Sequence, residues 1–135
     1  MTQNTLSLEE KKIRENVLDK GIHILADLYD IQAGNDEMYS ADLLEQYCEQ
    51  KVQEAGLTQV GKLFYQFPGS GVTGVVLLAE SHIAIHTWPE KAYLTLDIYV
   101  CNVSQDNTEK AKKLAQSFID LFQPGKLNRQ DIERE

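Results

Sequence analysis

The chain has 135 residues, of which 42% are hydrophobic and 25% are charged. These values are typical of one globular domain with its own core, so residues 1–135 are predicted to form a single domain. The net charge of −8 argues against a nucleic-acid partner, which would require a basic surface. No apolar stretch approaches the roughly 20 residues of a membrane span, and the N-terminus lacks the apolar core of a signal peptide. A cytoplasmic protein without membrane contact is therefore expected.

The first half of the chain predicts two helices and two strands. Ser7 and Glu10 form a capping box that predicts a helix from Leu8 to Lys20, within an N-terminal extension of residues 1–20. The patterns that follow predict a strand at Ile22–Tyr29, a loop at Asn35 and Asp36, a helix at Ala41–Ala55 and a strand at Thr58–Phe67. Cys48 lies on the apolar face of the second helix and is expected to be a buried thiol.

The second half predicts a turn, three strands and a helix. In chain order these are a turn at Pro68–Gly71, a strand at Val72–Ala79, a hairpin of Ile83–Trp88 with Tyr93–Cys101, and a helix capped by Thr108 that runs to Phe122. The first of these strands is apolar on both faces and is predicted to be central and buried. The last ten residues are polar, which leaves either an edge strand or a tail. This order predicts an α+β fold, a two-layer sandwich of a mostly antiparallel sheet with helices on one face.

The predicted hairpin places reactive side chains near one another. Its first strand begins beside the Glu80–Ser81 bond and carries His82 and His86 on one face. A turn centred between residues 90 and 91 would pair Trp88 with Tyr93 and His86 with Thr95. Continued along the two strands, this register puts Cys101 beside Glu80 and Ser81. The pattern therefore predicts that a thiol, two histidines and a Glu-Ser bond share one neighbourhood.

These residue types permit a self-cleavage reaction. The Ser81 hydroxyl can attack the carbonyl of Glu80 and convert the peptide bond into an ester, if the bond is strained and the oxyanion is stabilised. Elimination of that ester and hydrolysis with loss of ammonia would leave a pyruvoyl group on the second chain. Such a carbonyl can bind a substrate amine as a Schiff base and accept the electrons of a decarboxylation. A thiol such as Cys101 is a suitable proton donor near neutral pH.

The run ESHIAIHTWPE at residues 80–90, preceded by GVTGVVLLAE and followed by Cys101, resembles a known self-cleavage site. It is similar to that of the pyruvoyl-dependent S-adenosylmethionine decarboxylases of bacteria and archaea, and the resemblance covers roughly residues 21–122. By this resemblance the processing residues are Ser81 as the pyruvoyl precursor, Glu80 as the new C-terminus, His86 as the processing histidine and Thr73 where the family usually has a serine. The substrate residues it implies are Cys101 as the proton donor, Phe67 as the ring against adenine and sulfonium, and Glu90 as the acid on the ribose.

The resemblance also implies the activity. It predicts conversion of S-adenosylmethionine to the aminopropyl donor of spermidine synthesis, with the pyruvoyl group from Ser81 as the cofactor and no metal. It further implies a homodimer of processed chains.

Departures from the family pattern leave two alternatives open. The family loop FHxFSPxGVSGV reads FYQFPGSGVTGV here, with Tyr65 in the histidine position, and Asp30 replaces a frequent cysteine. Some relatives act on arginine or ornithine, and an acid near a cationic substrate would favour them. Thr73 in place of serine is the processing-site change that would suit a non-catalytic regulatory paralogue.

Two other residues are interpreted as structural. Trp88 is expected to lie in the core, and His23 is expected to have a structural role.

Overall fold

A computed structural model describes residues 7–8, 20–33, 35–79, 81–102 and 106–134. In chain order these residues form β1 (Gly21–Ile31), α2 (Asn35–Tyr39), α3 (Ala41–Ala55), β2 (Gln59–Gln66), β3 (Val72–Leu78), β4 (Ser81–Trp88), the 3₁₀ turn η1 (Pro89–Lys91), β5 (Tyr93–Val100), α4 (Thr108–Phe122) and β6 (Pro124–Arg134). The helix predicted at Leu8–Lys20 lies almost entirely outside the described residues.

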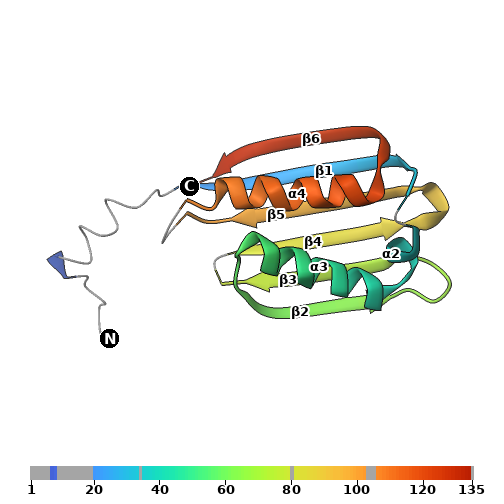
Figure 1. Cartoon of the computed structure of the whole chain (residues 1–135), viewed down its shortest axis with the longest axis horizontal. Helices are drawn as coiled ribbons and strands as arrows, with labels where there is room; N and C mark the ends of the chain where they lie inside the picture. Colours follow the sequence, from blue (N-terminus) through green and yellow to red (C-terminus); the bar gives the residue numbers. More distant parts are fainter. Residues whose placement is uncertain (1–6, 9–19, 34, 80, 103–105, 135) are drawn as a thin grey trace, which may run out of the picture.

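The six strands form one antiparallel sheet in the order β2-β3-β4-β5-β1-β6. Helices α3 and α4 lie side by side on one face of this sheet, and the opposite face carries no helix from the described part of the chain (Figure 1). The predicted two-layer α+β sandwich is confirmed. No helix among the described residues is long and apolar enough to cross a membrane.

The C-terminal residues form an edge strand, which decides between the two alternatives left by the sequence. β6 pairs along nearly its whole length with β1, from Gly21 opposite Arg134 to Ile31 opposite Pro124. β1 therefore lies between β5 and β6, two strands that come much later in the chain. β6 itself carries charged side chains such as Lys126 and Arg129, which discourage pairing of this edge with another chain.

The core lies between the sheet and the two helices. It is formed by alternate residues of the strands and by the inner faces of the helices, and its largest fully buried members include Phe118, Phe122, Ile24, Leu28, Leu44, Ile83, Leu96 and Ile98. Alternation in β5 is regular, with every second residue buried, because that strand is central and covered on one side only. Cys48 is fully buried in α3, as predicted.

Two predictions of burial are wrong. The strand at β3 was expected to be buried on both faces, but Leu77 is 49% exposed and Val75 is half-buried. Trp88 likewise lies half-buried on the helix-free face, where its ring stacks on Tyr93 at 5.3 Å, and not in the core. The reason in both cases is that helices cover only one side of the sheet. An apolar residue on the other side remains exposed in a single chain.

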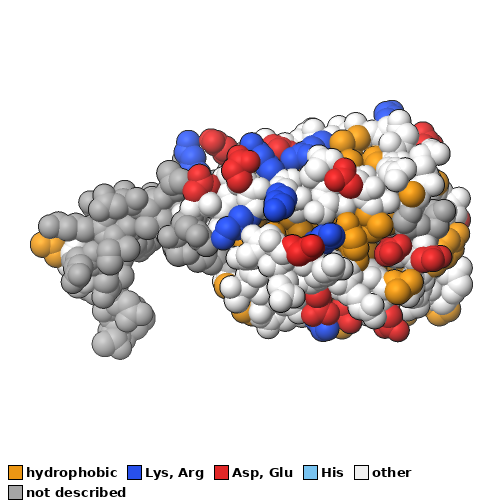
Figure 2. Space-filling view, viewed as in Figure 1, with side chains coloured by type: hydrophobic (Ala, Val, Ile, Leu, Met, Phe, Trp, Pro, Cys, Tyr) orange, Lys and Arg blue, Asp and Glu red, His pale blue; other side chains and the backbone are white. Residues whose placement is uncertain are grey.

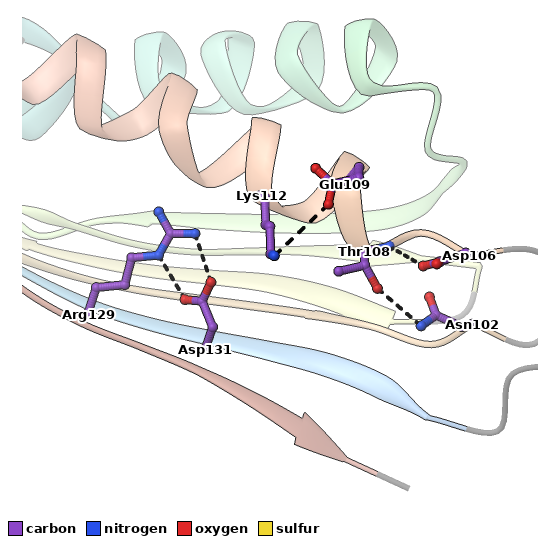
Figure 3. A network of polar contacts seen from close by, with 7 residues as sticks. All are labelled: Asn102, Asp106, Thr108, Glu109, Lys112, Arg129 and Asp131. Carbon is purple, nitrogen blue, oxygen red and sulfur yellow. Dashed lines mark hydrogen bonds and ion pairs between the residues drawn. The ribbon is translucent and has the colours of Figure 1, made fainter.

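Two local predictions also need correction. Asn35 and Asp36 begin the short helix α2, whereas a loop was expected. Thr108 is the first residue of α4 and not its cap, because the N-cap position is occupied by Asn107. The amide N–H of Thr108 donates to Asp106 Oδ1 at 3.0 Å, and its hydroxyl accepts from Asn102 (Figure 3). Figure 2 shows the helix-covered face with acidic and basic side chains intermingled.

Candidate active site

The register of the β4–β5 hairpin is the predicted one. Trp88 lies opposite Tyr93 and His86 opposite Thr95, and the last pair is His82 with Tyr99. Side chains of successive residues alternate between faces, so His82 and His86 project from the helix-free face of the sheet.

Close packing of the Gly-rich strand holds His86 against its neighbour. A Cβ atom at Gly71 would collide with the carbonyl of Thr87, and one at Gly74 would collide with the ring of Phe64. Glycine at position 71 therefore allows close approach to β4, and glycine at position 74 makes room for the Phe64 ring of β2. In the pairing of β3 with β4, Thr73 lies directly opposite His86. Its Oγ1 is 3.0 Å from Nδ1 of His86, so the two side chains share a hydrogen bond.

A cavity of about 400 Å³ opens beside this pair. Its lining includes four of the predicted site residues, namely Phe67, Thr73, His86 and Glu90. Ser70 also lines it and donates a hydrogen bond of 3.3 Å to the Glu90 carboxylate. The exposed Phe67 ring meets Tyr65 edge to face, with centroids 4.8 Å apart. The cavity thus combines an aromatic face, a carboxylate and an imidazole that is held by a hydroxyl.

Ser81 and Cys101 lie at the other end of the same hairpin. Ser81 is the first residue of β4 and pairs with Leu78, so only residues 79 and 80 connect β3 to β4. Cys101 directly follows β5, and its carbonyl accepts a 2.9 Å hydrogen bond from Nδ2 of Asn107. The thiol is partly exposed. Glu80 itself lies outside the described residues. The structure therefore describes only the Ser81 side of the predicted cleavage position.

The predicted neighbourhood is therefore only half formed within one chain. Cys101 and His82 lie at the Ser81 end, as expected. His86 is five positions further along β4, which is about 17 Å at roughly 3.4 Å per residue. An odd number of positions also places the Ser81 and His86 side chains on opposite faces. The expectation that both histidines lie beside Ser81 in one chain is wrong, because an extended strand separates residues that a short sequence motif brings together.

Comparison with known proteins places the chain in a family. The family model described as S-adenosylmethionine decarboxylase matches residues 22–135. The chain belongs to the S-adenosylmethionine decarboxylase family. It is 41% identical over 114 residues to the S-adenosylmethionine decarboxylase proenzyme of Aquifex aeolicus, a match that covers 84% of this chain and 80% of the relative. The proenzyme of Archaeoglobus fulgidus is 37% identical over 114 residues, or 84% of this chain and 96% of that protein.

A solved structure of the family has the same fold. The crystal structure of adenosylmethionine decarboxylase from Aquifex aeolicus superimposes with a TM-score of 0.74 at 38% sequence identity. The match covers 84% of this chain and 89% of that structure. The family match begins at residue 22, so it does not include the N-terminal extension.

One group of polar residues at the Ser81 end was missed by the sequence analysis. Tyr99 accepts a hydrogen bond of 3.3 Å from the Cys101 thiol, and its ring packs between His23 and His82. His23 Nε2 is 3.2 Å from the Asp97 carboxylate. The signal was present, since Asp97, Tyr99 and Cys101 share the polar face of one strand, but periodicity alone does not tell which of them touch.

The contact with Cys101 also affects Tyr99. The hydrogen bond with Cys101, and then burial, raise the pKa of Tyr99 above its ordinary value, and the nearby Arg134 opposes this in part. The phenol consequently stays neutral near neutral pH. Among the described residues no three His, Cys, Asp or Glu side chains are grouped so that they could hold a metal ion.

Proposed function

We propose that this chain is a proenzyme that cleaves itself between Glu80 and Ser81 and then decarboxylates S-adenosylmethionine as a homodimer. The observation that carries the proposal is the distribution of the site residues. The cavity with Phe67, His86 and Glu90 lies at one end of the β4–β5 hairpin, and Ser81 with Cys101 lies at the other, within a chain of this family.

Self-cleavage is assigned to Ser81. Its hydroxyl oxygen attacks the Glu80 carbonyl carbon, the C–N bond breaks, and an ester forms. Removal of the Cα proton of residue 81 then breaks the Cβ–Oγ bond and releases the Glu80 carboxylate. Water replaces the nitrogen of the resulting dehydroalanine and ammonia leaves, so the second chain begins with a pyruvoyl group. The acid–base group in this process is His86 of the second copy in the proposed homodimer, held by its Thr73 partner, because His86 of the same chain is too far from Ser81.

The position of Ser81 fits this reaction. A link of only residues 79 and 80 joins two paired strands, and strand pairing holds Leu78 and Ser81 opposite one another. Such a short connection keeps the bond to be broken at the end of two paired strands. Ser81 is half-buried at the strand end.

The decarboxylation uses residues from both ends of the hairpin. A pyruvoyl carbonyl supplies an electrophile for the substrate amine and a sink for the electrons left when carbon dioxide departs. Cys101 returns a proton to the substrate carbon. Phe67 offers its ring face to the sulfonium and adenine, a contact of order 1 kcal/mol, and Glu90 accepts hydrogen bonds from the ribose hydroxyls. Its carboxylate already accepts one from Ser70.

A homodimer would complete this site. The helix-free face of the sheet exposes large apolar side chains, including Leu63 at 71%, Leu77 at 49% and Ile132 at 43%. These side chains lie near both edges of the sheet, with His82, Tyr99 and His23 in the row between Leu77 and Ile132. Large exposed apolar side chains on a helix-free face favour a protein–protein interface there. If two copies stack these faces about a two-fold axis with their strands running oppositely, the cavity of one copy meets the Ser81 end of the other. The two halves that are separated within one chain then form two complete sites.

The substrate alternative receives little support from the residues that suggested it. Asp30 lies at the end of β1 with a left-handed backbone (φ 53°), next to Gly125 of β6. It is not among the residues that line the cavity. Tyr65 instead packs edge to face on Phe67, where it enlarges an aromatic surface suited to adenine. We therefore favour S-adenosylmethionine over arginine or ornithine.

The proposal is tested by the denatured mass of the purified protein. Two fragments are expected, residues 1–80 and a second fragment lighter than its serine form by about one ammonia. Ser81→Ala should remain one chain, whereas Ser117→Ala, which alters a half-buried serine of α4 far from the cavity, should be cleaved like the wild type. A wild-type chain that stays intact after long incubation would contradict self-processing and favour the regulatory paralogue.

A second measurement decides the substrate. Release of carbon dioxide is followed in parallel with S-adenosylmethionine, arginine and ornithine. Activity with S-adenosylmethionine that is absent in Ser81→Ala is expected. Activity with arginine or ornithine alone would move the proposal to the alternative substrate, and carbon dioxide release that survives Ser81→Ala would overturn the pyruvoyl mechanism.

A further inference from the structure

Tyr99 contacts the Cys101 thiol, and the proposed mechanism gives this contact no role. The thiol donates to the phenol oxygen over 3.3 Å. Tyr99 lies in β5 and Cys101 directly follows that strand, two positions further on. In extended backbone, side chains two positions apart lie on the same side and can touch. Cys101 is the proposed proton donor, so this phenol is in direct contact with a reacting group.

The ring of Tyr99 is held from several directions. His23 and His82 pack against it with centroid distances of 5.7 and 5.9 Å, and the Arg134 guanidinium lies over it at 5.0 Å. On its remaining side the backbone of Gly21 approaches so closely that an added Cβ would lie 3.1 Å from the ring. These neighbours fix the ring, and only the hydroxyl retains freedom to rotate.

We propose that Tyr99 is a positioning residue for the proton transfer made by Cys101. This rests on the proposed function of the site. When the S–H bond breaks and a C–H bond forms on the substrate carbon, negative charge moves from carbon to sulfur. The Tyr99 hydroxyl then turns and donates to the thiolate, a charge-assisted hydrogen bond about twice as strong as a neutral one. Tyr99 keeps its own proton, and the thiolate regains one from solvent before the next turnover.

The other titratable neighbours are less suited to this role. Nε2 of His23 contacts Asp97 at 3.2 Å, and Nδ1 lies 3.3 Å from the Arg134 guanidinium, which can only donate. Both ring nitrogens of His23 therefore have partners already. His82 contacts Tyr99 through its ring. The pKa of Tyr99 is raised by its hydrogen bond with Cys101, in agreement with a phenol that stays protonated while it stabilises the sulfur.

The contact is tested first without the pyruvoyl group. Two uncleaved proteins are compared, one with Ser81→Ala alone and one with Ser81→Ala and Tyr99→Phe together. Alkylation of Cys101 by iodoacetamide at pH 7.5 is followed in each by mass spectrometry. Phenylalanine retains the ring and its packing and removes only the hydroxyl. Loss of thiolate stabilisation should slow alkylation about 3- to 10-fold, because a lower thiolate fraction outweighs the higher intrinsic nucleophilicity. Tyr93→Phe, on the same strand and face but stacked on Trp88, is the matched control and should leave the rate unchanged.

The second test uses the cleaved enzyme. Tyr99→Phe should process fully, bind substrate with a KM within about twofold of the wild type, and lose about tenfold in kcat. Such a split separates a role in proton transfer from a role in folding or binding. An unchanged or faster alkylation rate, or an unchanged kcat, would overturn the role of Tyr99. Failure of wild-type cleavage would instead contradict the proposed function, and the alkylation test would still decide the contact.

Discussion

The Oγ1 of Thr73 lies 3.0 Å from Nδ1 of His86, across the pairing of β3 with β4. The resemblance implies a serine at this position, and threonine retains that hydroxyl on a β-branched side chain whose χ1 is more restricted. The bond shows that the threonine places its oxygen on the imidazole. This argues for a functional processing pair and against a regulatory paralogue.

Removing that hydroxyl should slow self-cleavage. Thr73→Val preserves the shape of the side chain and leaves Nδ1 of His86 without its partner, and we expect the half-time of cleavage to increase about 100-fold, within the usual range of acid–base contributions. Thr73→Ser should cleave at close to the wild-type rate. The half-time is measured from the intact masses of samples taken after synthesis. Thr95→Val is the matched control, because Thr95 faces His86 from β5. Equal rates for both valine variants would contradict the role of the Thr73–His86 bond.

Cleavage should not release the two fragments. The first fragment carries β1, β2 and β3, and the second carries β4, β5 and β6. Since β1 lies between β5 and β6, the first fragment is paired with the second on both sides of β1 and again between β3 and β4. Native mass spectrometry should therefore find the fragments together, and they should separate only in denaturant. Fragments that are detected separately by native mass spectrometry would show that cleavage disrupts the sheet.

A site shared between two copies predicts recovery of activity in mixed dimers. Cys101→Ala removes the proton donor and Phe67→Ala removes the substrate ring, so each variant alone should have little activity. When the two variants are co-expressed in equal amounts, half of the dimers contain one chain of each kind. Each mixed dimer has one intact site and one site that lacks both residues. About a quarter of wild-type activity should return.

A control pair distinguishes this recovery from other causes. Cys101→Ala and Ser81→Ala both remove residues at the Ser81 end of the hairpin. In a mixed dimer of these two variants, one site lacks Cys101 and the other lacks Ser81. No site is then intact, and activity should stay low. Equal recovery in both mixtures would contradict the shared site.

The two cysteines should differ sharply in reactivity. Burial of the Cys48 thiol among core residues, with a smaller contribution from Glu49 and Glu45, raises its pKa to about 12. Cys48 therefore stays protonated in the folded chain at pH 8, whereas the thiol of the unfolded chain has its ordinary pKa of 9.0 and is half ionised at pH 9.0. Iodoacetamide at pH 8 should modify Cys101 alone, and both cysteines should react after denaturation. Modification of Cys48 in the folded protein would contradict its burial.

The same shift has a consequence for stability. Below pH 9 the Cys48 thiol is protonated in both states, so its contribution to the free energy of unfolding is complete. As the pH rises toward about 12 the unfolded chain loses this proton and the folded chain does not, so stability declines. Cys48→Ala should lower stability at pH 7 through lost packing but show a weaker decline between pH 9 and 11 in denaturant titrations.

The local chemistry of the chain was readable from its residues. Alternation identified β4 and β5, and the turn between them set a register that pairs His86 with Thr95, because hairpin pairing is decided by nearby residues. The Gly-rich run and the Glu-Ser bond identified the family through a motif whose chemistry needs those side chains. Only the tertiary structure decided which face of β3 is exposed and that β1 lies between β5 and β6, since both depend on contacts between distant segments. It also separated Ser81 from His86, because a strand extends by about 3.4 Å per residue and a motif compact in sequence becomes two half-sites in space.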